Sequence, residues 1–101
     1  MERESPAGKI LRLRKQILIH SCIYYVLNDS VISDYDWSQK AKELCALQDE
    51  YPDISKEVPW YEAFKDFDPS TGYNLPIRDP YVIDEAQWIL EYHKSQIKHR
   101  S

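Results

Sequence analysis

The amino-acid sequence predicts an all-α fold: a helical hairpin, an aromatic-rich segment with a short helix, and a C-terminal helix. Three segments carry apolar residues at spacings of three, four and seven, the period of an amphipathic helix. Only two of the 101 residues are glycine, which argues against a turn-dense all-β fold. With 43% hydrophobic and 30% charged residues the composition is ordinary for a globular protein, so we expect one domain over residues 1–101.

The first predicted helix covers about residues 6–27. Ser5 supplies a hydroxyl that can cap free backbone amides, and Pro6 suits the first helical turn. The residues that follow at helical spacing are Ile10, Leu13, Ile17, Tyr24 and Leu27. Because the segment is nearly all apolar in its second half, we expect that half to be buried, and residues 28–30 to end the helix.

The second predicted helix covers about residues 33–50. Ser33 and Asp36 resemble a capping box in which Asp replaces Glu. Its apolar stripe consists of Trp37, Ala41, Leu44, Cys45 and Leu47, and Tyr51-Pro52 ends it. Because the connection between the two helices is short, they are expected to form an antiparallel hairpin.

The pattern changes after the hairpin. Residues 59–78, here called the aromatic strap, are expected to hold a short helix near Trp60, a turn at residues 68–72, and an extended stretch over residues 73–78. So many aromatic residues in an irregular segment predict a loop held across the hairpin. A last helix is expected over about residues 81–98, where apolar residues return to helical spacing.

Charge and cysteine content exclude several classes of protein. The formal net charge of -4 gives no overall attraction to nucleic acid, and the basic residues near the start are expected to form a solvated face: Arg3, Lys9, Arg12, Arg14 and Lys15. Cys22 and Cys45 lack metal-like spacing, and no apolar run reaches about 18 residues. The sequence therefore predicts a cytoplasmic protein with reduced thiols, no metal site and no membrane segment.

The motifs of the common enzyme classes are absent. The chain has no Gly-rich nucleotide loop and no H-E-x-x-H, C-x-x-C or G-x-S-x-G. His20 is expected to be a packed or edge residue, and Cys22 an inert core thiol. These observations favour a binding protein that is not an enzyme by itself.

One cluster of residues points to a ligand. Tyr24 and Tyr25 end the first predicted helix, Asp34 begins the second, and Trp37 and Ser38 follow one turn later. The turn would bring aromatic rings, a carboxylate and a hydroxyl to one end of the hairpin, where rings suit a flat or cationic heterocycle. The carboxylate can accept hydrogen bonds from ribose hydroxyls or an amide. The alternative is a generic hairpin in which the tyrosines are core residues and Asp34 only favours a helix start.

Residues 10–54 resemble the N-terminal Ia domain of bacterial NAD-dependent DNA ligases. The resemblance rests on Tyr24-Tyr25-Val26-Leu27-x-Asp29, Ile32-x-Asp34, Leu44, Leu47 and Tyr51-Pro52-Asp53-Ile54. In that family a hairpin holds the nicotinamide mononucleotide (NMN) half of NAD during enzyme adenylation. The resemblance implies that Tyr24, Tyr25 and Asp34 take part in such a site, and leaves residues 55–101 as a separate strap and C-terminal helix.

The match departs from the family at one position. The family's Tyr-Asp pair falls on Trp37 and Ser38, so the aromatic face remains while the second carboxylate is lost. A gapped register would place the pair on Tyr35-Asp36, but it deletes two residues in the first helical turn and rotates the side chains by roughly 200°. We prefer the ungapped register, because both ends of the match then stay in phase.

The resemblance leads to a binding function. No K-x-D-G motif is present to carry AMP, so the chain is not expected to be a ligase. The leading hypothesis is a stand-alone module that binds NAD or NMN in a cytoplasm, as in small ligase-related proteins of bacteriophages. The alternative is an interaction or regulatory module with a vestigial nucleotide site, docking on a ligase adenylation domain through Trp60, Tyr61, Phe64 and Phe67. Nucleic-acid binding through the basic ends, and NAD hydrolysis by Asp34, are weaker readings.

Overall fold

A computed structural model describes residues 4–100, and every regular element in that range is a helix. The helices are α1 (Pro6–Tyr25), α2 (Asp34–Glu50), α3 (Pro52–Glu57), α4 (Tyr61–Phe64) and α5 (Pro80–Arg100). The predicted all-α class is therefore confirmed. Arg3, one of the basic residues expected near the start, lies outside the described residues.

The helix α1 begins where the sequence predicts and ends two residues early. The Gly8 amide donates to Ser5 Oγ at 3.1 Å, which caps the first turn. At the other end the amides of residues 26 and 27 both donate to the Cys22 carbonyl, and Asn28 takes a left-handed conformation with φ of 55°. The helix ends two residues before the approximate predicted boundary at Leu27, because Asn tolerates positive φ and turns the chain at this point.

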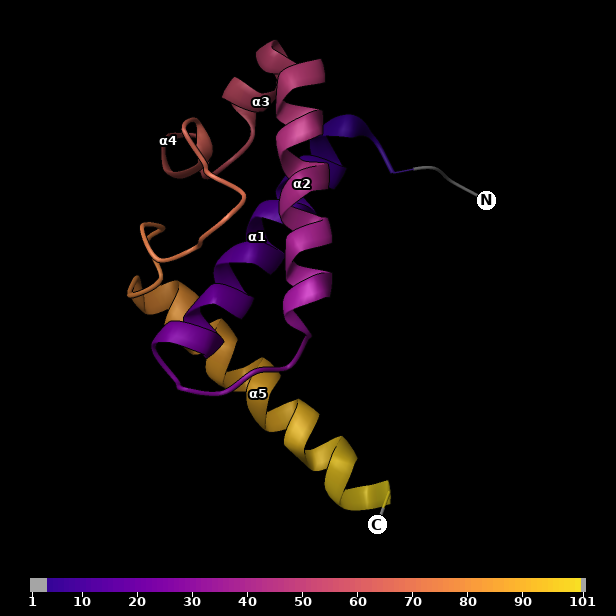
Figure 1. Cartoon of the computed structure of the whole chain (residues 1–101), viewed down its shortest axis with the longest axis vertical. Helices are drawn as coiled ribbons and strands as arrows, with labels where there is room; N and C mark the ends of the chain where they lie inside the picture. Colours follow the sequence, from indigo (N-terminus) through magenta and orange to yellow (C-terminus); the bar gives the residue numbers. More distant parts are fainter. Residues whose placement is uncertain (1–3, 101) are drawn as a thin grey trace.

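The helix α2 runs back along α1. Its start is capped as predicted, since the Asp36 amide donates to Ser33 Oγ at 3.1 Å. Figure 1 shows α1 and α2 side by side and running in opposite directions, joined by the turn after Tyr25. An exposed ion pair, Lys9 Nζ to Glu43 Oε2 at 2.7 Å, links the first turn of α1 to the middle of α2. The predicted antiparallel hairpin is confirmed.

The segment after the hairpin differs from the prediction in two places. Pro52 begins α3, because proline suits the first turn of a helix as well as it ends a preceding one. Residues 73–78 form successive turns where an extended stretch was expected. In these turns the Leu75 amide donates to the Gly72 carbonyl and the Ile77 amide to the Leu75 carbonyl. Residues 73–78 therefore form a compact series of turns, with Leu75 and Ile77 buried in the core.

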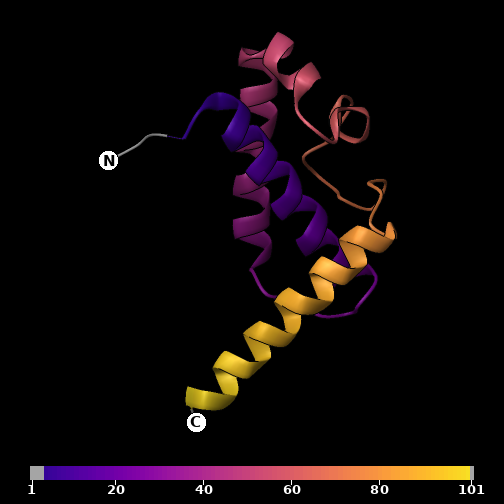
Figure 2. The same ribbon diagram turned by 180° about the vertical axis from the view of Figure 1, so that it is seen from behind.

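The core forms where α1 meets α2, the strap and α5. Figure 2 shows α5 crossing the lower end of α1, with its C-terminal half extending past the hairpin. The buried apolar side chains come from all of these segments: Ile10, Leu13, Ile17, Leu18, Cys22, Ile23, Ala41, Leu44, Val58, Phe64, Leu75, Ile77, Val82, Ala86 and Leu90. The expectation of burial at the end of α1 holds for Ile23 and fails for Tyr24, whose side chain is exposed.

Arg14 is fully buried, although it was expected on a solvated basic face. Its Nη1 donates to the Val58 and Pro59 carbonyls at 2.9 and 3.1 Å, and its Nη2 to the carbonyl and hydroxyl of Ser55 at 3.2 and 2.6 Å. Its Nε donates to Gln48 at 3.0 Å. The guanidinium has a fork of donors that matches several carbonyls at once, which a lysine ammonium lacks. It fastens the α3–α4 connection to the hairpin.

We predict that Arg14→Met lowers the free energy of unfolding by about 3 kcal/mol, because buried carbonyls lose their donors. Arg12→Met is the matched control, since Arg12 lies on the same helix and pairs with Glu4 at the surface, where ion pairs contribute little. Denaturant unfolding measures both variants. Equal losses in the two variants would contradict the assigned role of Arg14.

His20 is a second polar group of α1, and it is partly buried. Its Nδ1 is inaccessible and has no hydrogen-bond partner, alone among the buried side-chain nitrogens and oxygens that the structure describes. Burial, aided by the positive charge of Lys40, lowers the pKa of His20 from its usual 6.5. The neutral imidazole is therefore the form that the folded chain accommodates.

This burial predicts a pH dependence of stability. The unfolded chain binds the His20 proton more tightly than the folded chain does. The free energy of unfolding should therefore be unaffected by this group above pH 6.5 and should decrease as the pH falls below 6.5. His20→Gln should flatten the decrease. Urea unfolding at several pH values between about 7 and 5 tests this. An identical decrease in wild type and variant would show that the proton does not couple to folding.

Candidate functional site

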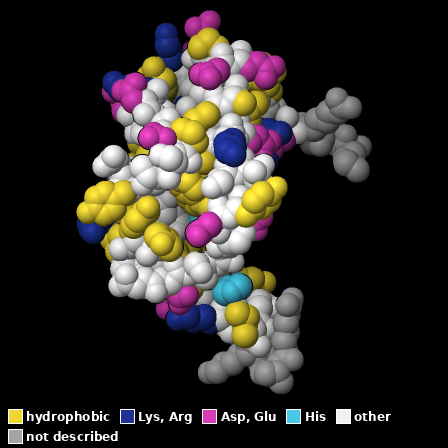
Figure 3. All heavy atoms as spheres, in the orientation of Figure 1, with side chains coloured by type: hydrophobic (Ala, Val, Ile, Leu, Met, Phe, Trp, Pro, Cys, Tyr) yellow, Lys and Arg dark blue, Asp and Glu magenta, His cyan; other side chains and the backbone are white. Residues whose placement is uncertain are grey.

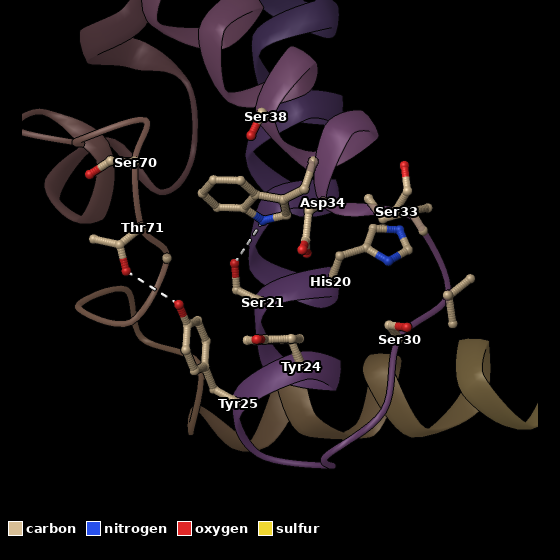
Figure 4. Close-up of a pocket in the computed structure, with 14 residues that line it drawn as sticks. His20, Ser21, Tyr24, Tyr25, Ser30, Ser33, Asp34, Ser38, Ser70 and Thr71 are labelled. Atoms are coloured by element: carbon tan, nitrogen blue, oxygen red, sulfur yellow. Dashed lines mark hydrogen bonds between the residues drawn. The ribbon is translucent and has the colours of Figure 1, made fainter.

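A cavity of about 190 Å³ lies at the end of the hairpin where α1 stops and α2 begins (Figure 4). Three segments form its wall: the last turns of α1, residues 30–38, and residues 70–72 of the strap. All five residues predicted from the sequence line it: Tyr24, Tyr25, Asp34, Trp37 and Ser38. The fold therefore brings the predicted residues together around one hollow that is partly open to solvent.

The two tyrosines lie differently in this wall. Tyr24 is 55% exposed, and its ring meets the Tyr25 ring edge to face at 4.9 Å. Tyr25 is half-buried, contacts the Tyr73 ring at 5.4 Å and hydrogen-bonds through its hydroxyl to Thr71 Oγ1 at 3.3 Å. Tyr24 thus offers a free aromatic face, while Tyr25 is held in place by the strap.

Trp37 is half-buried and fixed at two points. Its indole Nε1 donates to Ser21 Oγ at 3.1 Å (dashed line in Figure 4), and its ring meets Phe67 edge to face at 6.3 Å. Ser21 belongs to α1 and Phe67 to the strap, so Trp37 joins all three segments of the site. Its position is set before any ligand arrives.

Asp34 carries the one carboxylate among the residues that line the cavity. It stands in the first turn of α2, where the helix dipole favours a negative charge, and its side chain is solvent-accessible. Ser38 lies one turn further on. The residues of the gapped register, Tyr35 and Asp36, are exposed and do not line the cavity. An acid–base pair of carboxylates for NAD hydrolysis is not found around this cavity.

Sequence reasoning missed two parts of the site. His20 lines the cavity one helical turn before Tyr24, and that i, i+4 spacing was a signal that could have indicated it. The strap wall at Ser70, Thr71 and Gly72 had no comparable signal, because these residues read only as a turn. The strap therefore reaches the end of the hairpin that carries the predicted ligand residues.

The aromatic residues predicted as a docking surface mostly pack within the protein. Phe64 is fully buried, so it cannot contact a partner as that hypothesis required. Phe67 meets Phe64 at 5.1 Å, and Trp60, which adopts a positive φ of 73°, stacks near Tyr81 at 6.4 Å. These rings fill the space between the strap and its neighbours.

The remaining polar groups offer little further chemistry. Cys22 and Cys45 are free thiols, and burial raises the pKa of both, which disfavours the reactive thiolate. Within the described residues no group of three His, Cys, Asp or Glu side chains is placed to hold a metal ion. None of the described helices is long and apolar enough to cross a membrane.

Comparison with known proteins identifies the hairpin. The sequence model of one family, "DNA ligase-like, N-terminal NAD+-binding domain", matches residues 3–58. The DNA ligase of Thermoanaerobacter sp. (strain X514) is 36% identical over 72 residues, 65% of this chain and 11% of that protein. The DNA ligase of Prosthecochloris aestuarii is 32% identical over 95 residues, 86% of this chain and 14% of that protein. No solved structure matches the chain.

The family match covers α1, α2 and α3, and therefore the two helices that carry the predicted ligand residues. The chain spans only 11% and 14% of the length of these two curated ligases, so the likeness concerns one domain of a larger protein. Within that limit the match extends over more than half of the chain. The chain belongs to the family of DNA ligase-like, N-terminal NAD+-binding domains.

Proposed function

We propose that this domain binds the nicotinamide mononucleotide part of NAD, or free NMN, and has no ligase activity by itself. One observation carries the proposal: the five side chains that the ligase resemblance assigns to NMN line a single cavity. The family match to NAD+-binding domains supports the same class of ligand.

The chemistry of the cavity suits a nicotinamide ring. Tyr24 and Trp37 offer aromatic faces on which a flat, positively charged pyridinium can stack. Asp34 supplies a negative charge and can accept from the carboxamide or a ribose hydroxyl. A volume of about 190 Å³ is below the range of about 300–1,000 Å³ for drug-sized ligands. The ring would therefore enter, and the ribose and phosphate would lie at the open side.

Ser38 makes the proposed site weaker than one with two carboxylates. A serine hydroxyl can donate or accept a hydrogen bond but brings no charge to face the pyridinium. Asp34 therefore provides all of the negative charge on the cavity wall. We expect modest affinity, with selectivity for the nicotinamide ring arising from stacking more than from charge.

We propose that the chain has no ligase activity by itself because it lacks a recognisable nucleophilic lysine for AMP. Adenylation needs a lysine that takes up AMP, and no lysine lines the cavity, nor does the sequence contain K-x-D-G. The proposal places the module in a cytoplasm, with a bacteriophage as a candidate source. Lys and Arg side chains are scattered over the face in Figure 3 and form no broad basic patch there, which agrees with a nucleotide ligand in place of nucleic acid.

A second candidate function is docking on another protein, such as a ligase adenylation domain acting in trans. The observation that favours it is an aromatic pair on α5. Trp88 and Tyr92 are 63% and 56% exposed and stack with an interplanar angle of 6°. Large aromatic side chains often anchor interfaces. This surface differs from the strap residues first expected to make such a contact.

NMN added to the purified chain is expected to shift the backbone amide resonances around Tyr24, Asp34 and Trp37. Asp34→Asn should weaken NMN binding by about tenfold or more, because a hydrogen bond to a charged group contributes about 1.5–3 kcal/mol. Asp36→Asn is the matched control: it makes the same charge change in the same helical turn, at an exposed position outside the cavity. NMR titration yields all three affinities.

Two outcomes would overturn the proposal. One is a wild-type chain whose cavity resonances do not respond to millimolar NMN. The other is an equal loss of affinity in Asp34→Asn and Asp36→Asn, which would attribute binding to overall charge and not to this cavity.

A further inference from the structure

We propose that the strap supplies a ligand contact of its own: the Thr71 hydroxyl donates a hydrogen bond to an acceptor oxygen of the nicotinamide nucleotide. The inference rests on the proposed function and adds to it a residue beyond the family match, which ends at residue 58. It follows from three features of residues 70–73: their close approach to α1, their hydrogen bonds, and the direction of their side chains.

Gly72 fixes how close the strap lies to the hairpin. A Cβ at this position would lie 2.9 Å from the Ser21 Cβ and 3.1 Å from Cζ2 of Trp37, and would collide with Ser21 Oγ. The Gly72 backbone therefore rests directly on Ser21 and on the Trp37 indole that Ser21 holds in place. Only glycine permits this approach, and the approach carries Thr71 to the cavity wall.

The hydrogen bonds of Thr71 are compatible with a hydroxyl hydrogen that is left for a ligand. Thr71 Oγ1 accepts from the Tyr73 amide at 3.2 Å and lies 3.3 Å from the Tyr25 hydroxyl. A phenol, with a pKa near 10, is a stronger donor and a weaker acceptor than an alkyl hydroxyl. Either hydroxyl can donate in this pair, and on this chemical ground we assign the donor to Tyr25. Both lone pairs of Thr71 are then used, and the Thr71 hydrogen is available to a ligand.

The side-chain directions agree with this assignment. In Figure 4 the Thr71 hydroxyl points toward Tyr25 on the cavity side, whereas the neighbouring Ser70 hydroxyl points away. A nicotinamide nucleotide presents acceptor oxygens in its carboxamide, its ribose and its phosphate. Each of these oxygens can accept a hydrogen bond from a neutral donor. The Asp34 carboxylate only accepts hydrogen bonds, so it cannot donate one to these oxygens.

The test compares NMN affinity by NMR titration in wild type, Thr71→Val, Thr71→Ser and Ser70→Ala. Thr71→Val keeps the shape and removes the donor, and should weaken binding by about threefold to tenfold, the range for one hydrogen bond. Thr71→Ser should restore the affinity, and Ser70→Ala should leave it unchanged. In wild type the amides of residues 70–73 should shift together with those of Tyr24 and Asp34. Unliganded spectra of Thr71→Val check that Trp37 and Gly72 keep their positions.

The outcomes separate this inference from the proposed function. A wild type that does not bind NMN overturns both. A wild type that binds, with Thr71→Val equal to it or with resonances of residues 70–73 unmoved, overturns only the role of Thr71. Repeating the titrations with nicotinamide and nicotinamide riboside identifies the acceptor: a Thr71→Val loss shared by all three ligands assigns the carboxamide, and a loss confined to NMN assigns the phosphate.

Discussion

The buried guanidinium of Arg14 is the interaction on which the rest of the arrangement depends. Its partners are not carboxylates: the guanidinium donates to the backbone carbonyls of residues 55, 58 and 59. This fixes where the chain leaves the hairpin after α3, and so fixes the path of the strap. Two helical turns further along α1, Gly72 of the strap packs directly against Ser21. The site's third wall is thus set by contacts at two points along the same helix.

The site itself combines rigid and adaptable parts. Trp37 and Tyr25 are held by hydrogen bonds to α1 and the strap, respectively, before a ligand is present. Tyr24 and Asp34 are exposed, and their side chains have room to adjust to a ring and its substituents. Such a division lowers the entropic cost of binding for half of the contacts while keeping the entrance open. It is consistent with a domain that recognises one end of a dinucleotide.

Helix patterning predicted the hairpin and the cluster of site residues, while the longer-range features escaped it. Ser5 and Ser33 marked helix starts because capping is a local hydrogen bond. Burial of Arg14 depends on carbonyls more than 40 residues away, and an arginine near other basic residues gives no local sign of that. The same holds for Gly72, whose need for glycine comes from Ser21 on another element. Pro52 carries two local signals at once, because proline both ends a preceding helix and suits the first turn of a new one, so the start of α3 is not distinguished by the sequence pattern.

The central claim is that a nicotinamide ring stacks between the end of α1 and the start of α2. Intermolecular nuclear Overhauser effects in the complex with NMN test it directly, since they report proton pairs within about 5–6 Å, the contact range of stacked rings. The account predicts effects from the nicotinamide ring protons to the rings of both Tyr24 and Trp37. Effects only to Trp88 and Tyr92 on α5, or none under saturating NMN, would contradict it.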